Sequence, residues 1–213
     1  MLSDVKPGPR NGRSKRELTA IATDCFSRFG FRGSSIDRIA RMAGVTKGAI
    51  YYHFRDKEAL LAEAVNDRVR EFESRVEAAC RGVAPDEALR RILEVCQSHA
   101  SSNDHPRFII TLMIEAIDTN DEVSERLRNT MRRFRSFLAR VVRQGQEQGL
   151  FDPGADANRV AASYTSAVMG AEIQYYQDPE SFDMSAALGV FLDCLLQSLK
   201  REPEAPPGPE EQA

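Results

Sequence analysis

The sequence predicts an all-α protein of about nine helices. Apolar residues recur three and four positions apart through almost the whole chain, which is the period of an amphipathic helix. No segment shows the alternation typical of strands, and Gly, Pro, Asp and Ser separate the periodic segments. With 213 residues, 42% hydrophobic and 29% charged, the chain has an ordinary globular composition and enough length for a substantial core.

The first predicted helix begins at Ser14, because its hydroxyl and the Glu17 carboxylate are spaced as a capping box. Helical spacing of apolar residues then continues to Gly30, which ends the helix. We expect this helix to pack across the two helices that follow it. Residues 1–13, which are rich in Pro and Gly, are predicted to form a flexible basic arm.

The segment from Ser35 to Lys57 contains two short helices joined by a turn. The first ends at Gly44, the residue type that most easily adopts positive φ, and Thr46 can cap the second. Two helices joined in this way are typical of the helix-turn-helix, whose second helix enters the major groove of DNA. The first helix of the motif is defined by its apolar positions Ile36, Ile39, Ala40 and Ala43.

The second motif helix carries side chains suited to phosphate and base contacts. Lys47 can reach a phosphate or a guanine, the aromatic run ending at His53 offers donors on flat apolar bodies, and Gly48 lets the backbone approach base edges. The Ser35 hydroxyl and the free N–H groups beside it can hold a phosphate. We therefore predict that DNA is contacted by Ser35, Thr46, Lys47, Gly48, Ala49, Tyr51, Tyr52 and His53.

The run GVTKGAIYYHFRDKEALL closely resembles the signature of TetR-family transcriptional regulators. With the preceding helices, the resemblance covers roughly Ser14 to Leu61. It implies an N-terminal three-helix DNA-binding domain over 14–57 and a larger helical effector-binding and dimerisation domain over 58–200. It also assigns to Lys57, at the start of the next helix, a contact with a DNA phosphate.

The distribution of charge supports a DNA-facing head. Residues 1–57 hold 12 Lys and Arg against 5 Asp and Glu, whereas residues 58–213 hold 17 against 27. Positive charge beside the motif favours DNA binding, because neutralising phosphates supplies much of the affinity. An accidental cluster of solvated charges is the alternative.

The remaining helices are predicted from the same spacing. Phe108 to Ala116 is nearly all apolar, so we expect it to lie centrally buried. Residues 201–213, rich in Pro and Glu, are predicted to be disordered. The other predicted helices run from Lys57 to about Arg81, from Pro85, from Asp121 and Glu122, from Ala157 to about Gln177, and from about Ser181 to Lys200.

The last two predicted helices suit a four-helix interface with a second copy of the chain. Small residues, including Gly170, lie on one helix, and the other carries a wide Leu-rich face. An intramolecular core would use similar residues. The resemblance implies the homodimer, since the last two helices form it in that family.

The region 58–200 is also expected to enclose an apolar cavity for a small-molecule effector. Its aromatic and Met side chains predict an apolar or aromatic ligand, and Glu115 or Glu172 allows a cationic or hydroxylated one. The same residue types are typical of an ordinary core. The candidate lining residues are Phe72, Cys96, His99, Phe108, Met113, Glu115, Phe134, Tyr164, Met169, Glu172, Gln174 and Tyr175.

Several other classes of protein are disfavoured. The sequence shows no nucleophile with a base and no phosphate loop, so we expect no enzyme and no cofactor. Glu115 with Asp118 and Cys96 with His99 share helix faces as a metal site would require, but satisfied polar groups beneath the core are the favoured interpretation, so we expect no metal. The four cysteines are far apart, which favours buried free thiols over disulfides. The absence of a long apolar run and of a signal-peptide pattern predicts a cytoplasmic protein without a membrane span.

These features together predict a homodimeric transcriptional regulator that binds double-stranded DNA. We expect a repressor that is released from a palindromic operator by its effector. One alternative is a DNA-binding protein controlled by a protein partner or without any effector. The other is a small helical carrier or enzyme in which the motif is incidental.

Overall fold

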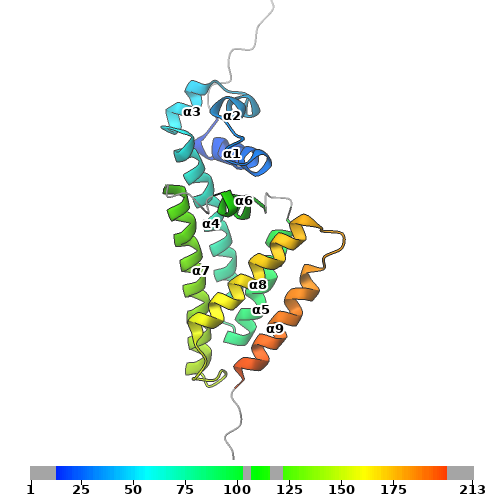
Figure 1. Ribbon diagram of the computed structural model, residues 1–213. Helices are drawn as coiled ribbons and strands as arrows, with labels where there is room; N and C mark the ends of the chain where they lie inside the picture. The colour runs from blue at the N-terminus through cyan, green and yellow to red at the C-terminus, as the bar shows by residue number, and fades with distance from the viewer. Residues whose placement is uncertain (1–12, 103–106, 116–121, 201–213) are drawn as a thin grey trace, which may run out of the picture. The chain divides into compact units, whose positions relative to one another are not determined.

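The protein is described by a computed structural model over residues 13–102, 107–115 and 122–200, and these residues form nine α-helices (Figure 1). The all-α prediction is therefore confirmed. The predicted tail at 201–213 and all of the predicted arm except Arg13 lie outside these ranges. The helices are α1 (Lys15–Phe29), α2 (Ile36–Ala43), α3 (Lys47–His53), α4 (Lys57–Cys80), α5 (Pro85–Ala100), α6 (Arg107–Glu115), α7 (Glu122–Glu147), α8 (Ala157–Gln177) and α9 (Met184–Leu199).

The predicted helix ends are confirmed in the first half of the chain. Ser14 and Glu17 form the capping box of α1, and Gly30 ends that helix at φ 68°. Gly44 ends α2 in the left-handed conformation, where the absence of a Cβ avoids strain. The Asp56 carboxylate accepts from the Ala59 N–H at 2.7 Å and so caps α4.

The last helix begins at Met184, later than the predicted start near Ser181. Asp178 holds the preceding turn, since its carboxylate accepts from the Ser181 N–H at 3.3 Å. Asp183 then caps α9 by accepting from the Ala186 N–H at 2.9 Å. The Asp side chain closest to the apolar series therefore decides where the helix starts.

The chain packs as two compact units. Of the described residues, the first unit comprises 13–77, 98–102, 107–115 and 122–131, and the second comprises 78–97 and 132–200. The predicted functional division into 14–57 and 58–200 stays a prediction.

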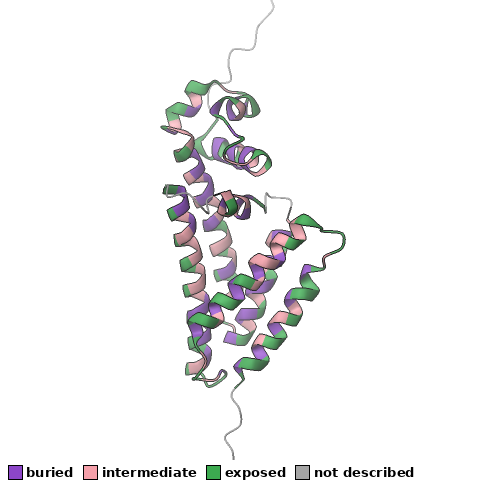
Figure 2. Cartoon of the chain, viewed as in Figure 1, coloured by how far each residue is buried: buried purple, intermediate pink, exposed green. Residues whose placement is uncertain are grey.

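The core of the first unit is built on α1, α2, α3 and α6 with the first parts of α4 and α7 (Figure 2). Phe26 of α1 and Phe108 of α6 are buried and stacked, with ring centroids 6.5 Å apart. Ile50 is fully buried and anchors α3 to this core. The expectation that α6 lies centrally buried is wrong at Ile114, which is 54% exposed, although Phe108, Ile110 and Leu112 are buried.

In the second unit, α8 and α9 lie side by side (Figure 1). The Tyr164 hydroxyl on α8 is buried and donates to the Leu89 carbonyl of α5 at 2.8 Å. Leu188, Leu192 and Leu196 form the buried side of α9. Of the cysteines, Cys25 and Cys96 are buried as predicted, Cys80 is half-buried and Cys194 is exposed; all four are free thiols. None of the helices in the described ranges has the length and apolar character needed to cross a membrane.

Candidate nucleic-acid interface

Helices α2 and α3 each begin with a capping side chain, and a hydrogen-bonded turn joins them. The Ser35 hydroxyl accepts from the Arg38 N–H at 3.2 Å, and the Thr46 hydroxyl accepts from the Ala49 N–H at 3.2 Å. In the turn, the Val45 N–H donates to the Ala40 carbonyl at 3.0 Å. The two caps satisfy free N–H groups at the helix starts, and the bond in the turn helps to fix the direction in which α3 leaves α2.

The outer face of α3 is formed by aromatic side chains. Tyr52 is 85% exposed and Tyr51 is 52% exposed, which is unusual for residues of this size. The Tyr52 ring meets the half-buried His53 ring edge-on at 4.9 Å between centroids. Hydroxyl groups on flat apolar bodies can donate to phosphates and base edges.

Lys47, which opens α3, already has a partner inside the protein. Its ammonium lies 2.7 Å from a carboxylate oxygen of Asp37 on α2, and both side chains are more than half exposed. Asp37 was not among the predicted site residues, because no local pattern links it to Lys47. A phosphate that binds Lys47 must share or displace this carboxylate.

Gly48 in the first turn of α3 is not required by packing within the described chain. A Cβ at this position would lie 3.7 Å from the Thr46 hydroxyl oxygen, which is an ordinary contact. A helix gains up to about 1 kcal/mol when Gly is replaced by Ala. The lack of a side chain at Gly48 therefore leaves the surface of α3 open to close approach by a binding partner.

Arg13, the last residue of the predicted arm, is hydrogen-bonded to the helix-turn-helix. Its guanidinium donates to the Ala43 carbonyl at the end of α2, with 2.5 Å between Nε and O. Cations favour helix C-termini, where carbonyl groups lack partners. This bond joins the start of the described chain to the helix-turn-helix.

Lys57 uses its ammonium within the first unit. The nitrogen donates to the carbonyls of Phe31 at 3.0 Å and Ser34 at 3.1 Å, and it lies 4.0 Å from the centroid of the Phe31 ring. Two of its three N–H donors thus have acceptors in the turn between α1 and α2. The predicted phosphate contact of Lys57 stays a prediction.

Five of the predicted effector-lining residues lie in the first unit. Phe72 and His99 are in contact, with ring centroids 5.6 Å apart. Phe108 belongs to the core, and Met113 packs against it. The Glu115 carboxylate accepts from the Phe31 N–H at 3.0 Å.

The other predicted lining residues lie in the second unit. Cys96 and Tyr164 are buried, and the Tyr164 ring meets that of Phe191 at 5.9 Å. Gln174 is exposed, and the half-buried members are Phe134, Met169, Glu172 and Tyr175. Burial raises the pKa of the Glu172 carboxyl to about 8, so this group is largely neutral near pH 7.

The raised pKa of Glu172 makes stability depend on pH. The unfolded carboxyl titrates near 4.5, so the native state holds one more proton between about 4.5 and 8. The contribution of this neutral carboxyl to the free energy of unfolding is fully present below pH 4.5 and is lost as the pH rises toward 8. We expect Glu172→Gln to remove this decline, measured as the melting temperature of each protein from pH 4.5 to 9. Glu94→Gln, at an exposed position of the same unit, is the control; an equal effect of both changes contradicts the assignment.

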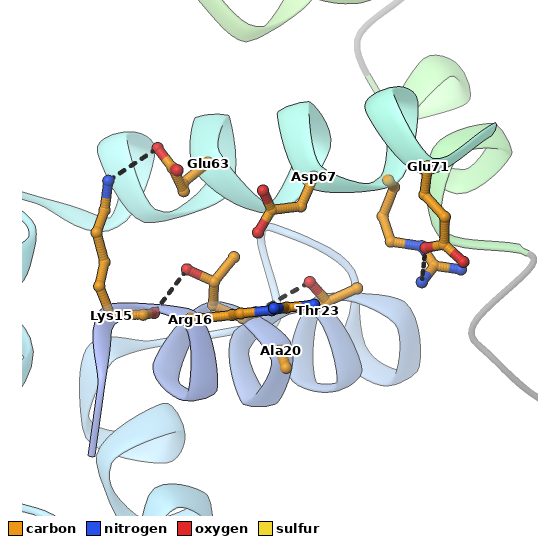
Figure 3. A pocket seen from close by; sticks show the side chains of 9 residues that line it. Lys15, Arg16, Ala20, Thr23, Glu63, Asp67 and Glu71 are labelled. Carbon is orange, nitrogen blue, oxygen red and sulfur yellow. Dashed lines mark hydrogen bonds and ion pairs between the residues drawn. The ribbon is translucent and has the colours of Figure 1, made fainter. Parts of the chain in front are cut away.

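A polar cleft of about 730 Å³ lies between α1 and α4 in the first unit (Figure 3). The Lys15 ammonium bridges it to a Glu63 oxygen at 3.1 Å, and Asp67 points into it from α4. None of the predicted effector-lining residues lines this cleft. Its mixed charges differ from the apolar cavity that we expected.

Comparisons with known proteins match both parts of the chain. Residues 18–64 match the family described as bacterial regulatory proteins, tetR family, and residues 85–175 match the tetracyclin repressor-like C-terminal domain. The chain is 22% identical over 185 residues to the fatty acid metabolism regulator protein of Bacillus subtilis (strain 168). The aligned residues cover 86% of this chain and 94% of that protein.

Two solved structures share the fold. A TetR transcriptional regulator from Chloroflexus aurantiacus J-10-FL aligns with a TM-score of 0.80 and 24% identity, over 88% of this chain and 96% of that chain. AibR, in complex with isovaleryl coenzyme A and operator DNA, aligns with a TM-score of 0.70 and 21% identity, over 85% of this chain and 97% of that chain. The first family match contains α2, α3 and the exposed tyrosines, and the second extends into α8. The helix-turn-helix and the helices that follow it place this chain in the tetR family of bacterial regulatory proteins.

Proposed function

We propose that two copies of this chain form a dimer that represses transcription by occupying a palindromic operator, and that a small apolar or aromatic effector releases it. Family membership makes the chain a DNA-binding transcriptional regulator. The proposal adds the dimer, the sign of regulation, the effector, a cytoplasmic location and the absence of enzymatic activity. The observation that carries it is the exposed Tyr51 and Tyr52 pair on the capped helix α3.

The DNA contacts are proposed at the positions that the sequence predicted. They are Ser35 and Thr46 at the helix starts and Lys47, Gly48, Ala49, Tyr51, Tyr52 and His53 on α3. Ile50 of the same helix is buried and is not among them. In a two-fold dimer each α3 enters one major groove, so the operator half-sites lie at least about 34 Å apart.

The dimer is supported by open small residues on α8 and α9. No described atom lies within 4 Å of an ideal Cβ on Gly170 or Gly189, although glycine in a helix lowers stability. Val190 of α9 is 67% exposed. These features suit close packing against the same helices of a second copy.

The effector class is suggested by the relatives. One similar protein is a fatty acid metabolism regulator, and AibR was solved with isovaleryl coenzyme A. Acyl-coenzyme A thioesters carry an apolar chain, which agrees with the apolar and aromatic side chains of the predicted lining residues. We therefore propose acyl-coenzyme A thioesters as the first effectors to test.

The proposal is tested by selecting bound duplexes from random DNA near physiological salt and sequencing them. Enrichment of one palindrome is expected, followed by its release when acyl-coenzyme A thioesters of increasing chain length are titrated. A folded protein that enriches no sequence contradicts the proposal. Enrichment without release by any thioester supports control by a protein partner or by no effector.

Gly48→Ala is expected to separate folding from DNA binding. The melting temperature should stay equal or rise, because Ala fits at this position and favours the helix. Operator affinity should fall by about tenfold, since the new methyl group holds α3 away from the base edges. Unchanged affinity would show that the backbone of α3 does not approach the DNA closely. Both quantities are measured on one preparation, by thermal unfolding and by DNA titration.

Asp37→Asn is expected to strengthen binding to DNA of random sequence by several-fold. The change removes a carboxylate that competes with phosphates for the Lys47 ammonium. The slope of log affinity against log salt should become steeper by up to about one. Glu87→Gln is the matched control, because Glu87 also forms an exposed ion pair, with Arg91, but lies on α5. Equal effects of the two changes would assign the gain to net charge alone.

A further inference from the structure

Phe31, in the turn between α1 and α2, is held on both sides by helices that are distant in sequence. Its N–H donates to Glu115 Oε2 at the end of α6, at 3.0 Å. Its carbonyl accepts from Lys57 Nζ at the start of α4, also at 3.0 Å. The Lys57 ammonium reaches the Ser34 carbonyl as well, at 3.1 Å. A carboxylate and an ammonium thus hold one short turn through charge-assisted hydrogen bonds.

The surrounding residues fit this arrangement. A Cβ on Gly30 would collide with the Glu115 carboxylate, and Gly30 also has a φ of 68°. Only glycine therefore lets the carboxylate reach the turn without strain. The Phe31 ring packs against Phe26 at 5.9 Å, and Phe26 stacks on Phe108 of α6. Helix α6 is thus joined to α1 by an apolar contact and to the turn after α1 by a polar one.

The turn leads directly into the helix-turn-helix. Within it, the Ser34 N–H donates to the Phe31 carbonyl at 3.2 Å, and the Ser34 hydroxyl donates to the Gly30 carbonyl at 2.6 Å. The next residue, Ser35, caps α2. The position of the Phe31 peptide groups therefore sets the place and direction in which α2 begins, and α3 packs on α2.

We propose that Glu115 and Lys57 are positioning residues for DNA binding, which act by holding the Phe31 to Ser34 turn rather than by touching DNA. This inference rests on the proposed function, because its readout is operator affinity. It assigns Lys57 a role different from the phosphate contact that the family resemblance implies. It also assigns a role in DNA binding to a carboxylate, a group that repels phosphates.

The sign of the effect separates positioning from electrostatics. Removing a negative charge near a DNA-binding surface strengthens binding when only long-range electrostatics act. Positioning gives the opposite result: Glu115→Ala should weaken operator binding about tenfold, the effect of losing a hydrogen bond to a charged group. Glu115→Gln should stay near the wild-type affinity, because the amide oxygen still accepts from the Phe31 N–H.

The salt dependence separates the two roles of Lys57. A lysine that binds a phosphate contributes about one to the slope of log affinity against log salt. If Lys57 holds the turn, Lys57→Met should weaken operator binding and leave the slope unchanged. A slope reduced by about one overturns the positioning role of Lys57 in favour of the phosphate contact.

The experiment measures operator affinity at several salt concentrations for the wild type, Glu115→Ala, Glu115→Gln, Lys57→Met and the control Glu71→Ala. Glu71 pairs with Arg68 on α4 of the same unit and does not contact the turn. All measurements are made well below the melting temperature of each variant, so that a merely structural loss of stability leaves affinity unchanged. Glu115→Ala that binds as well as or better than the wild type overturns the inference.

Amide hydrogen exchange at Phe31 tests the contact without DNA. Glu115→Ala should speed exchange of this N–H, and Glu115→Gln and Glu71→Ala should not. A wild type that binds no selected operator contradicts the proposed function. The contact between Glu115 and the Phe31 to Ser34 turn is then judged by hydrogen exchange at Phe31 alone. Unchanged exchange in Glu115→Ala overturns the inference whatever the DNA result.

Discussion

Replacing Tyr51 and Tyr52 together with Ala is expected to lower operator affinity by at least about 30-fold, since each good base contact contributes about 1 to 3 kcal/mol. The melting temperature should change little, because both side chains extend from the outer face of α3 and Tyr52 is 85% exposed. The core contact of α3 is made instead by Ile50, which stays in place. The two quantities are measured by DNA titration and by thermal unfolding of the same samples.

Two sets of control variants make this result specific. Tyr51→Phe with Tyr52→Phe keeps the rings and removes only the hydroxyls, so it separates stacking and apolar contact from hydrogen bonding. Leu150→Ala removes an exposed apolar side chain from the second unit and should leave affinity unchanged. If the double Ala variant binds the operator as tightly as the wild type, α3 is not the recognition helix.

Phe26→Ala is expected to lower the free energy of unfolding by about 3 to 5 kcal/mol, the range for removing a buried aromatic ring. Phe26 is 1% exposed, lies in the core of the first unit and contacts the rings of both Phe31 and Phe108. Its loss opens a cavity between α1 and α6 and removes both aromatic pairs. Denaturant unfolding followed by far-ultraviolet circular dichroism measures the change.

The matched control lies on the same helix. Phe29 is 46% exposed, and the Arg38 guanidinium lies over its ring, 4.2 Å from the centroid. Phe29→Ala should therefore cost only about 0.5 to 1 kcal/mol, the range for an exposed cation–π pair. A loss below about 1 kcal/mol for Phe26→Ala would contradict the core that we describe.

The elements that could be predicted from sequence are those decided by a few neighbouring residues. Ser14, Thr46 and Asp56 cap helices through bonds to N–H groups three positions later, and Gly30 and Gly44 end helices through their own conformational freedom. The prediction that failed for α6 needed information from further away. Ile114 lies in an apolar run and is exposed, because the burial of each position depends on which distant helices cover it.

The sequence alone determined the all-α fold, the helix-turn-helix and the family, because helical periodicity, caps and the motif are local features. Only the tertiary structure showed which polar groups meet. Phe31 and Glu115 are 84 positions apart, and Leu89 and Tyr164 are 75 positions apart. Such pairs depend on how distant helices pack. The sequence contains several carboxylates that could accept from the Phe31 N–H, and only the packing of α6 shows that Glu115 does so. The Lys47 bond to Asp37 and the Lys57 bonds to two carbonyls arise in the same way.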